Sequence, residues 1–387
     1  MKIAILHEML VKFWWAEKVV ETFLEAFPEA SLFTLIYDEK KIWKFFPKEK
    51  INNQVFRLKT QKIYNITKKQ RLCLPFMALS VEQLDFSEYD IVLCSSSWFA
   101  HWAITKPETK FIVYYHSPAR YMWDWTNEYK KDLKFPFFKK FFIHKLNKLL
   151  LKLRQWDYIA SKRSDFSLAN SKNTLSRIKK YYKKEAKILY PPVETNRFSK
   201  KINISKTNFN ILKQKFNFKE KNYYIIISAL TEFKKIDVAI KAFNKLEQDL
   251  IIIWDWDYKK ELQKQVKKEN IKFVWKQFWD DLVALVQNSL GLIFPWEEDF
   301  WIVPVEAMSA WKPVFALKKW WLTESVIAWT TWDFFLDKNW KDFIEKFKIF
   351  HKNNLNWVYK EENCKKQAQK FSKENFIKEL KKIVEKI

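Results

Sequence analysis

Short runs of apolar, mostly β-branched or aromatic residues alternate with longer amphipathic segments along the first half of the chain. Runs such as KIAIL, DIVLCSSS and KFIVYY have the length of buried strands, while AEKVVETFLEAF repeats its apolar residues at helical spacing. Apolar strands separated by helices are typical of a parallel sheet that is covered on both faces. The pattern therefore predicts a doubly wound α/β domain.

The same alternation starts again after the proline pair in ILYPPVETNRF, residues 188 to 198. A Pro-Pro pair disfavours helix and indicates an extended junction. Five further strands are predicted, in YYIIISAL, DLIIIWDWD, IKFVWKQF, GLIFP and KPVFAL, with helices near 237–246, 258–268, 280–289 and 303–310. We therefore predict two Rossmann-like domains, 1–190 and 191–365, and a Lys/Glu-rich amphipathic helix over 366–387, with ligands at the carboxyl ends of the strands.

The composition changes this picture at the turns, because the 387 residues include 21 Trp and one Gly. An ordinary chain of this length has roughly 7% glycine, about 27 residues, and needs it where φ is positive. The Trp residues occur in doublets and in turn-like segments such as AWTTWDFF, without the period of a buried face. We hypothesise that most Trp stand where the native protein has Gly, through UGA codons read as Gly in the source. Trp123 and Trp156, in aromatic or amphipathic surroundings, are predicted to be native.

The formal net charge of +26 indicates an anionic partner: nucleic acid, a phosphorylated substrate or an anionic membrane. AT-rich coding produces the same excess of Lys, Asn, Ile and Phe and is the alternative explanation. The three Cys share no metal-binding spacing, which is typical of a reducing compartment. The N-terminal MKIAILHEML reads as a strand, and no apolar run reaches about 18 residues. We expect a cytoplasmic protein, with peripheral membrane contact left open.

The strongest chemical signal is the pair Glu298 and Glu306 in PWEEDFWIVPVEAMSAWKPV. Glu298 lies in the loop after the strand GLIFP, and Glu306 lies in the helix predicted to begin near Ile302. The free N–H groups and positive dipole end of that helix suit a diphosphate. The alternative is two carboxylates on an ordinary amphipathic helix.

With Gly at the Trp positions, the segment reads PGEEDFGIVPVEAMSAGKPV and resembles the E-x7-E motif of glycosyltransferase family 4, retaining GT-B enzymes that use nucleotide sugars. FWWAEKVV, IIIWDWD, FVWKQFWDDL and KKWWLTESV are similar to the glycine-containing loops of that family. YYHSPARYMWD, LRQWDYIASKRSDFSLANS and YPPVETNRF resemble a mannosyltransferase-like branch that builds surface polysaccharides. The resemblance implies the GT-B fold, with two Rossmann-like domains facing a central cleft and a C-terminal helix that packs back toward the N-terminal domain.

The resemblance also implies a donor site in the second domain. Glu298 would bind hydroxyls of the donor sugar, Glu306 would hold the ribose hydroxyls, and Lys234 would neutralise the diphosphate leaving group as the glycosidic bond breaks. Lys235 would assist Lys234, because Ala229 stands where most of the family has Arg. The remaining expected donor contacts are the backbone at Phe300, Trp301 and Ile302 and, near the base, Lys276 and Gln277.

In the first domain, the resemblance makes His116, directly after the strand KFIVYY, a contact to the donor sugar or the reaction centre. Trp14 and Trp15, read as glycines, would form a loop near the donor phosphate and the acceptor. The expected acceptor-binding residues are Arg120, Tyr121, Asp124 and His101. From residue type alone, Arg120 fits a local ion pair equally well, and either histidine fits a structural role.

Residues 129 to 156, YKKDLKFPFFKKFFIHKLNKLLLKLRQW, interleave Lys with Phe and Leu. A basic amphipathic helix of this kind can lie on an anionic bilayer, which suits an enzyme that extends a lipid-linked acceptor. The alternative is a surface helix packed on its own domain.

The expected reaction is therefore transfer of a hexose from a nucleotide sugar, GDP-mannose by resemblance, to a lipid-linked or saccharide acceptor in surface polysaccharide synthesis, with no metal and no cofactor. A glycoside hydrolase using Glu298 and Glu306 as acid and base is one alternative, but it leaves the helix N-terminus and the lysines without a function. The other alternative is a non-enzymatic binder of nucleic acid or membrane that stacks bases on exposed Trp. It requires the Trp residues to be native, so nucleic acid is not an expected partner.

Overall fold

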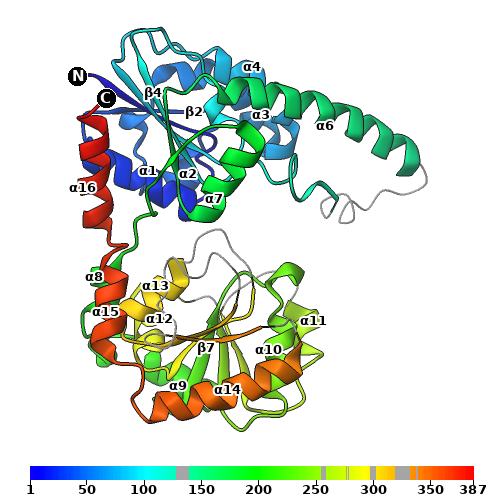
Figure 1. The fold of residues 1–387 in the computed structure, drawn as a ribbon, viewed down its shortest axis with the longest axis vertical. Coiled ribbons are helices and arrows are strands. Elements are labelled where there is room, and N and C mark those ends of the chain that lie inside the picture. The colour runs from blue at the N-terminus through cyan, green and yellow to red at the C-terminus, as the bar shows by residue number, and fades with distance from the viewer. Residues whose placement is uncertain are drawn as a thin grey trace. The chain divides into compact units, whose positions relative to one another are not determined.

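The computed structural model describes residues 1–127, 139–253, 259–275, 277, 279–296, 302–318, 332–336 and 339–387. Their contacts divide the chain into two units (Figure 1). Unit 1 comprises Met1–Pro192 and Phe376–Ile387, and unit 2 comprises Val193–Asn375. Each unit has its own sheet, and each is described by itself below.

Unit 1 is built on a parallel sheet that has six strands among the described residues, in the order β2-β1-β3-β4-β5-β6. The strands are β1 (Ile3–His7), β2 (Ser31–Thr34), β3 (Ile91–Ser96), β4 (Lys110–Tyr115), β5 (Phe166–Ala169) and β6 (Lys187–Ile188). Side chains alternate between the two faces of a strand. Ala4 and Leu6 accordingly join one hydrophobic core, and Ile3 and Ile5 join the other.

The helices of unit 1 cover both faces of this sheet, which explains why β1 is buried along its whole length. They are α1 (Trp15–Ala26), α2 (Glu39–Ile42), α3 (Lys59–Thr67), α4 (Met77–Glu82), α6 (Lys139–Ser161), α7 (Lys172–Arg177) and α16 (Lys373–Val384). The last of these brings the C-terminus of the chain onto the N-terminal unit, beside α1 (Figure 1). The ring of Phe376 stacks on that of Phe23 with centroids 6.0 Å apart, so the predicted packing of the C-terminal helix is confirmed.

One boundary differs from the prediction. The single helix expected over 366–387 begins at Lys373, and residues 366–369 end the preceding helix, α15 (Glu361–Gln369). The Lys/Glu-rich composition of both helices is continuous, so the break at residues 370–372 leaves no clear mark in the hydrophobic pattern.

Unit 2 is built on a second parallel sheet, again with six strands among the described residues, in the order β12-β11-β10-β7-β8-β9. The strands are β7 (Tyr223–Ile227), β8 (Asp249–Ile253), β9 (Ile271–Val274), β10 (Gly291–Phe294), β11 (Val314–Leu317) and β12 (Trp332–Phe335). Gly291 lies where β10 approaches β11 closely, because a Cβ there would lie 2.7 Å from the carbonyl oxygen of Pro313. The one glycine of the chain is therefore required by packing.

The helices of unit 2 follow the predicted alternation with the strands. They are α8 (Thr195–Ser199), α9 (Phe209–Phe216), α10 (Ile236–Phe243), α11 (Lys259–Gln263), α12 (Trp279–Gln287), α13 (Ile302–Ser309), α14 (Trp340–Leu355) and α15. The fold class predicted from the sequence, two doubly wound α/β domains, is confirmed.

Two Trp residues end helices in the left-handed conformation. Trp311 follows α13 with φ 63°, and Trp357 follows α14 with φ 56°. At each site the Trp N–H bonds back three residues and the next N–H bonds back five residues, which is the Schellman motif. Helix α9 ends in the same way at Asn217, with φ 47°. Gly and then Asn are the residues that favour this position, whereas an indole-bearing residue is strained there.

Candidate active site

Helix α13 of unit 2 holds a buried carboxylate. Each of its residues from Ile302 to Ser309 is buried, and all but Glu306 and Ser309 are apolar. Glu306 is only 6% exposed, a placement that carboxylates adopt when they are paired or bind a ligand. Its partner in the sequence motif, Glu298, lies outside the described residues, as do Phe300 and Trp301.

Lys234 is a buried cation at the carboxyl edge of the same sheet. It ends the turn η8 (Glu232–Lys234) that follows β7, and it is 7% exposed. Its Nζ lies 4.9 Å from the ring centroid of Trp296, the indole that follows β10. Strands β7 and β10 are neighbours in the sheet. The structure therefore brings Lys234 to the segment that leads into α13.

Trp296 itself departs from the glycine hypothesis. Its side chain is 1% exposed and lies against Phe294, with ring centroids 3.9 Å apart. An indole with this packing fills space that a glycine would leave empty.

The other donor-site residues are less informative. Lys235 is partly buried and adopts φ 47° as the residue before α10. Gln277 Nε2 donates to the carbonyl oxygen of Trp275, 2.6 Å away, beyond the end of β9, and Lys276 lies outside the described residues. Ala229 follows β7 in the loop that leads to Lys234.

In unit 1, His116 follows β4 directly and is partly buried. Its Nε2 lies 2.8 Å from Oγ of Ser95, which in turn lies 3.1 Å from Nδ1 of His7. Burial, together with the nearby His7, lowers the pKa of His116 to about 3. The ring of His116 is therefore neutral throughout the physiological pH range.

The carboxylate of Glu8, 4% exposed, organises the loop after β3. Its Oε1 accepts hydrogen bonds from the backbone N–H groups of Ser97, at 2.6 Å, and Trp98, at 2.7 Å, and from the hydroxyl of Ser96 at 3.1 Å. Sequence reasoning missed His7, Glu8 and Ser95. The available signal was the polar residues directly after the apolar runs KIAIL and DIVLC, because the carboxyl ends of parallel strands meet at one edge of a sheet.

The loop after His116 contains a compact ion-pair cluster. Oδ2 of Asp124 lies 3.0 Å from Nε of Arg177 and 4.0 Å from Nε of Arg120. The guanidinium of Arg120 also stacks over Trp125, 3.6 Å from the ring centroid, and Tyr121 contacts Trp98 edge to face at 5.5 Å. These contacts favour the local ion pair that the sequence left open for Arg120.

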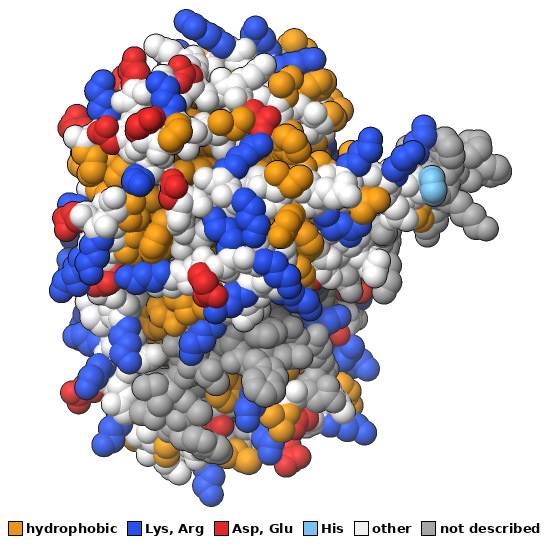
Figure 2. Space-filling model, turned by 45° about the horizontal axis from the view of Figure 1, so that its top comes forward, with side chains coloured by type: hydrophobic (Ala, Val, Ile, Leu, Met, Phe, Trp, Pro, Cys, Tyr) orange, Lys and Arg blue, Asp and Glu red, His pale blue; other side chains and the backbone are white. Residues whose placement is uncertain are grey.

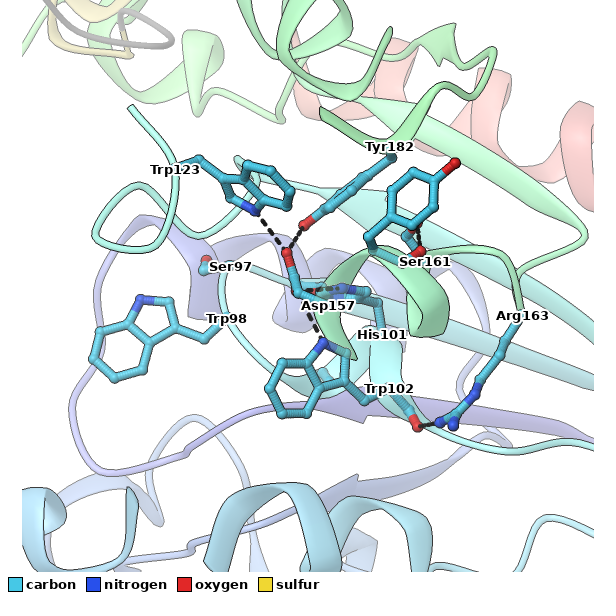
Figure 3. A network of polar contacts seen from close by, with 12 residues as sticks. Ser97, Trp98, His101, Trp102, Trp123, Asp157, Ser161, Arg163 and Tyr182 are labelled. Carbon is cyan, nitrogen blue, oxygen red and sulfur yellow. Dashed lines mark hydrogen bonds and ion pairs between the residues drawn. The ribbon is translucent and has the colours of Figure 1, made fainter. Parts of the chain in front are cut away.

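His101 lies inside unit 1 and belongs to a network around Asp157 of α6 (Figure 3). Its ring is 2% exposed, with Nδ1 2.9 Å from Oγ of Ser96 and Nε2 3.0 Å from Oδ1 of Asp157. Asp157 also accepts from Nε1 of Trp102 at 2.9 Å, Nε1 of Trp123 at 2.7 Å and the hydroxyl of Tyr182 at 2.9 Å. This placement favours the structural role for His101 over contact with an acceptor.

Trp14 and Trp15 lie at the N-terminus of α1, with side chains 42% and 44% exposed. The N–H of Trp14 donates to Oε2 of Glu17 at 2.9 Å. Trp14 has φ −132°, which any residue adopts, so the backbone conformation alone does not demand glycine there. No group of three or more potential metal ligands occurs among the described residues. None of the described helices is both long enough and apolar enough to span a bilayer.

Comparison with known families and structures gives a consistent result. Residues 208–371 match the family model described as Glycosyl transferases group 1. No curated protein matches the chain. HepE from Anabaena, solved in complex with UDP, superposes with a TM-score of 0.71 at 14% identity and full coverage of both chains. Sucrose-phosphate synthase from Thermosynechococcus elongatus superposes with a TM-score of 0.72 at 12% identity, over 100% of this chain and 99% of that one.

WaaG, a glycosyltransferase involved in lipopolysaccharide biosynthesis, has a TM-score of 0.61 at 15% identity over 98% of this chain and 99% of its own. These likenesses show the fold, and the family match places a glycosyltransferase group 1 domain in unit 2. The chain has the GT-B fold of these structures, and its residues 208–371 match a glycosyltransferase group 1 domain.

Proposed function

We propose that this glycosyltransferase is a retaining enzyme of family 4 that moves a hexose from a nucleotide sugar to a lipid-linked or saccharide acceptor. The observation that carries the proposal is the presence of a buried anion and a buried cation in the matched domain. Glu306 is buried in α13, and Lys234 is buried beside the segment that precedes α13. A carboxylate that accepts two ribose hydroxyls and an ammonium that faces a diphosphate have the charges that a nucleotide sugar requires.

In this proposal the remaining motif residues complete the donor site. Glu298 binds hydroxyls of the transferred sugar, and Lys235 supports Lys234 at the diphosphate in place of the Arg that Ala229 replaces. The base lies near Lys276 and Gln277, and the backbone at Phe300, Trp301 and Ile302 contacts sugar and phosphate. His116 contacts the sugar or the reaction centre, and the acceptor binds beside Arg120, Tyr121 and Asp124.

The proposed chemistry is a front-face substitution. The bond between the anomeric carbon and the leaving phosphate oxygen breaks, while the acceptor hydroxyl forms the new glycosidic bond on the same face. The proton of the acceptor hydroxyl passes to the departing phosphate, whose negative charge Lys234 stabilises. The reaction so written uses neither a metal nor a cofactor.

Two donors are candidates. The mannosyltransferase-like motifs favour GDP-mannose, while HepE, which shares the fold, has been solved with UDP and with UDP-glucose. Polysaccharide synthesis on the inner face of the cell membrane accommodates either donor. The identity of the base and of the sugar is therefore the first thing to be tested, in the donor-panel assay described below.

We also propose that the native protein has glycine at most Trp positions. Trp311 and Trp357 support this, because both occupy the C′ position of a Schellman motif. Trp102 and Trp123 are proposed to be native, since each donates its indole N–H to Asp157. Sequencing the gene tests both statements: we expect UGA at positions 311 and 357 and UGG at 102 and 123, and UGG at all four would contradict the hypothesis.

Contact with an anionic membrane through α6 is part of the same proposal. Lys145, Lys148 and Lys152 are exposed on this helix, as are Leu149 and Leu151, both 53% exposed. Basic and hydrophobic side chains adjoin each other over the projecting helix (Figure 2). Attraction of the lysines to anionic headgroups and burial of the apolar side chains in the membrane interface would both favour binding of such a surface.

The decisive experiment is an assay of nucleotide release with a panel of GDP and UDP sugars. The protein is made with glycine at the proposed positions, and the sequence as printed is assayed beside it. We expect activity with one donor from the glycine form. We expect far less from the printed sequence, because an indole at 301 would fill space proposed for the donor phosphate and Trp311 is strained at the end of α13. Full activity of the printed sequence would contradict the glycine proposal, and no turnover with any donor would contradict the transferase proposal.

A further inference from the structure

Two histidines of unit 1 are joined through one serine hydroxyl. Oγ of Ser95 lies 3.1 Å from Nδ1 of His7 and 2.8 Å from Nε2 of His116. His7 ends β1, Ser95 lies in β3, and His116 follows β4; β3 pairs with both of the other strands. The three side chains therefore form one hydrogen-bonded row across the carboxyl ends of three adjacent strands.

The direction of the hydrogen bonds follows from a fourth atom. Nδ1 of His7 also lies 3.2 Å from the carbonyl oxygen of Ser95, and a carbonyl oxygen can only accept. Nδ1 of His7 therefore carries a proton, so the Ser95 hydroxyl accepts from it and keeps its own hydrogen for another acceptor. When that hydrogen points to Nε2 of His116, Nε2 accepts and the single proton of the neutral ring lies on Nδ1.

The charged groups around the row favour this arrangement. Oε1 of Glu17, on α1, lies 3.8 Å from Nε2 of His7, and Oε2 of Glu8 lies 3.6 Å from Nδ1. Burial by itself lowers the pKa of His7, but the hydrogen bond and charge of Glu17 and the charge of Glu8 outweigh burial and raise it. Lys12, in the loop before α1, also interacts with Glu17. A positive charge on His7 in turn disfavours a second positive charge on His116.

The other nitrogen of His116 is available. Nδ1 has no hydrogen-bond partner among the residues that the structure describes, and the ring itself contacts Tyr114 edge to face at 5.2 Å. With the proton on Nδ1, the row presents a single N–H donor at the carboxyl edge of the sheet.

We propose that Ser95 and His7 are positioning residues that hold His116 as the neutral Nδ1–H tautomer, so that its ring donates one hydrogen bond to a hydroxyl of the sugar substrate. This inference rests on the proposed function, in which His116 contacts the donor sugar or the reaction centre. A neutral ring in this tautomer binds a hydroxyl without forming an ion pair with the diphosphate. It also leaves the acceptor proton to the departing phosphate.

The test combines a spectroscopic signature with kinetics on the full-length protein that has glycine at the proposed positions, which is the wild type for the variants below. The chain has five histidines, so selective 15N-histidine labelling, with assignment by single His→Gln variants, resolves the ring nitrogens. We expect His116 to show a protonated Nδ1 and an unprotonated Nε2 from pH 5 to 8. Ser95→Ala should mix the tautomers and lower kcat/KM for the nucleotide sugar about five- to tenfold, the effect of one hydrogen bond. Ser95→Thr should restore both the Nδ1–H tautomer and the wild-type kcat/KM.

Ser167→Ala is the matched control, because it removes another buried hydroxyl, on β5, whose hydrogen-bond partner among the described residues is Ser164. It should leave both the His116 resonances and kcat/KM unchanged. A cationic or Nε2-protonated His116 in the wild-type protein, or an unaltered tautomer in Ser95→Ala, would overturn the proposal. Absence of sugar transfer by the wild-type protein with every donor would instead overturn the proposed function and the hydrogen bond to sugar, while the NMR result decides the tautomer separately.

Discussion

Nε2 of His101 lies 3.0 Å from Oδ1 of Asp157, and neither side chain is more than 2% exposed. The two residues come from different elements: a turn after β3 and the long helix α6. Asp157 also accepts hydrogen bonds from two indoles and a phenol, so one carboxylate links the core of unit 1 to the loop that follows His116.

Asp157→Asn is therefore expected to destabilise the protein by about 3 kcal/mol or more. The amide places an NH2 group against donors that need an acceptor, and removing one partner of a buried pair leaves the other uncompensated. Urea unfolding measures the change. Asp90→Asn, at an exposed carboxylate, should cost less than about 1 kcal/mol, and an equal loss in both variants would contradict the assigned role.

Trp311→Gly is expected to stabilise unit 2 by about 1 kcal/mol, because glycine enters the left-handed region without the cost that a Cβ imposes. Trp311 has φ 63°, and its buried indole Nε1 has no hydrogen-bond partner among the described residues. Thermal unfolding compares this variant with Trp102→Gly. The latter removes a fully buried indole that bonds to Asp157, and a loss of about 3–5 kcal/mol is expected. Destabilisation in both would argue that Trp311 is native.

The stability of unit 1 should depend on pH through His116. Its pKa is about 3 in the folded protein and about 6.5 when unfolded. Below pH 6.5 the unfolded state binds a proton that the folded state does not bind, so acidification destabilises the fold. The free energy of unfolding of wild type, relative to His116→Gln, should fall by up to about 2 kcal/mol between pH 6.5 and 5.

The control for this experiment is His144→Gln, which removes a histidine at an exposed position on α6 and leaves His116 in place. His7 affects the stability of the fold over a different pH range. Its pKa is raised in the folded protein, so its stabilising contribution is complete below pH 6.5 and is lost as the pH rises through the folded-state value. A difference between wild type and His116→Gln that is constant from pH 5 to 6.5 would contradict the assigned pKa.

Glu306→Gln is expected to weaken binding of the nucleoside diphosphate roughly 10- to 100-fold. The neutral amide replaces a carboxylate that is proposed to accept two ribose hydroxyls, and hydrogen bonds to charged groups are worth about 1.5–3 kcal/mol. Isothermal titration calorimetry with GDP and UDP measures the loss. Glu362→Gln, at an exposed position on α15, serves as the control. Unchanged affinity in Glu306→Gln would place the ribose elsewhere.

The triple variant Lys145→Gln, Lys148→Gln, Lys152→Gln should lower partitioning to vesicles that contain anionic phospholipid. Each lysine near such a surface contributes about 1 kcal/mol at most, so a loss of up to about 100-fold is expected. The control carries Lys341→Gln, Lys346→Gln and Lys352→Gln on α14 of unit 2, with the same change in net charge. Co-sedimentation at physiological salt measures both. If both triple variants lost the same amount of vesicle binding, the binding would depend on overall charge and not on α6.

The sequence alone was sufficient to predict the two doubly wound sheets, the C-terminal helix that packs on unit 1 and a glycosyltransferase of the GT-B fold. Strand and helix patterns are local, since the side chains that decide them lie within a few residues of each other. The motif around Glu306 is local for the same reason. The break between α15 and α16 was missed because both helices have similar Lys/Glu-rich surfaces.

Only the tertiary structure decided which polar groups meet. Ser95 joins histidines that are 88 and 21 residues away in sequence, and Asp157 gathers donors from three other segments. It also distinguished the Trp residues, since Trp311 ends a helix with φ 63° while Trp102 is fully buried. Residue types determine what a side chain can bond, but burial and hydrogen-bond partners depend on packing between strands and helices that are distant in sequence. That dependence is why His101 lies buried against Asp157 while His116 lies against Ser95 at the carboxyl edge of the sheet.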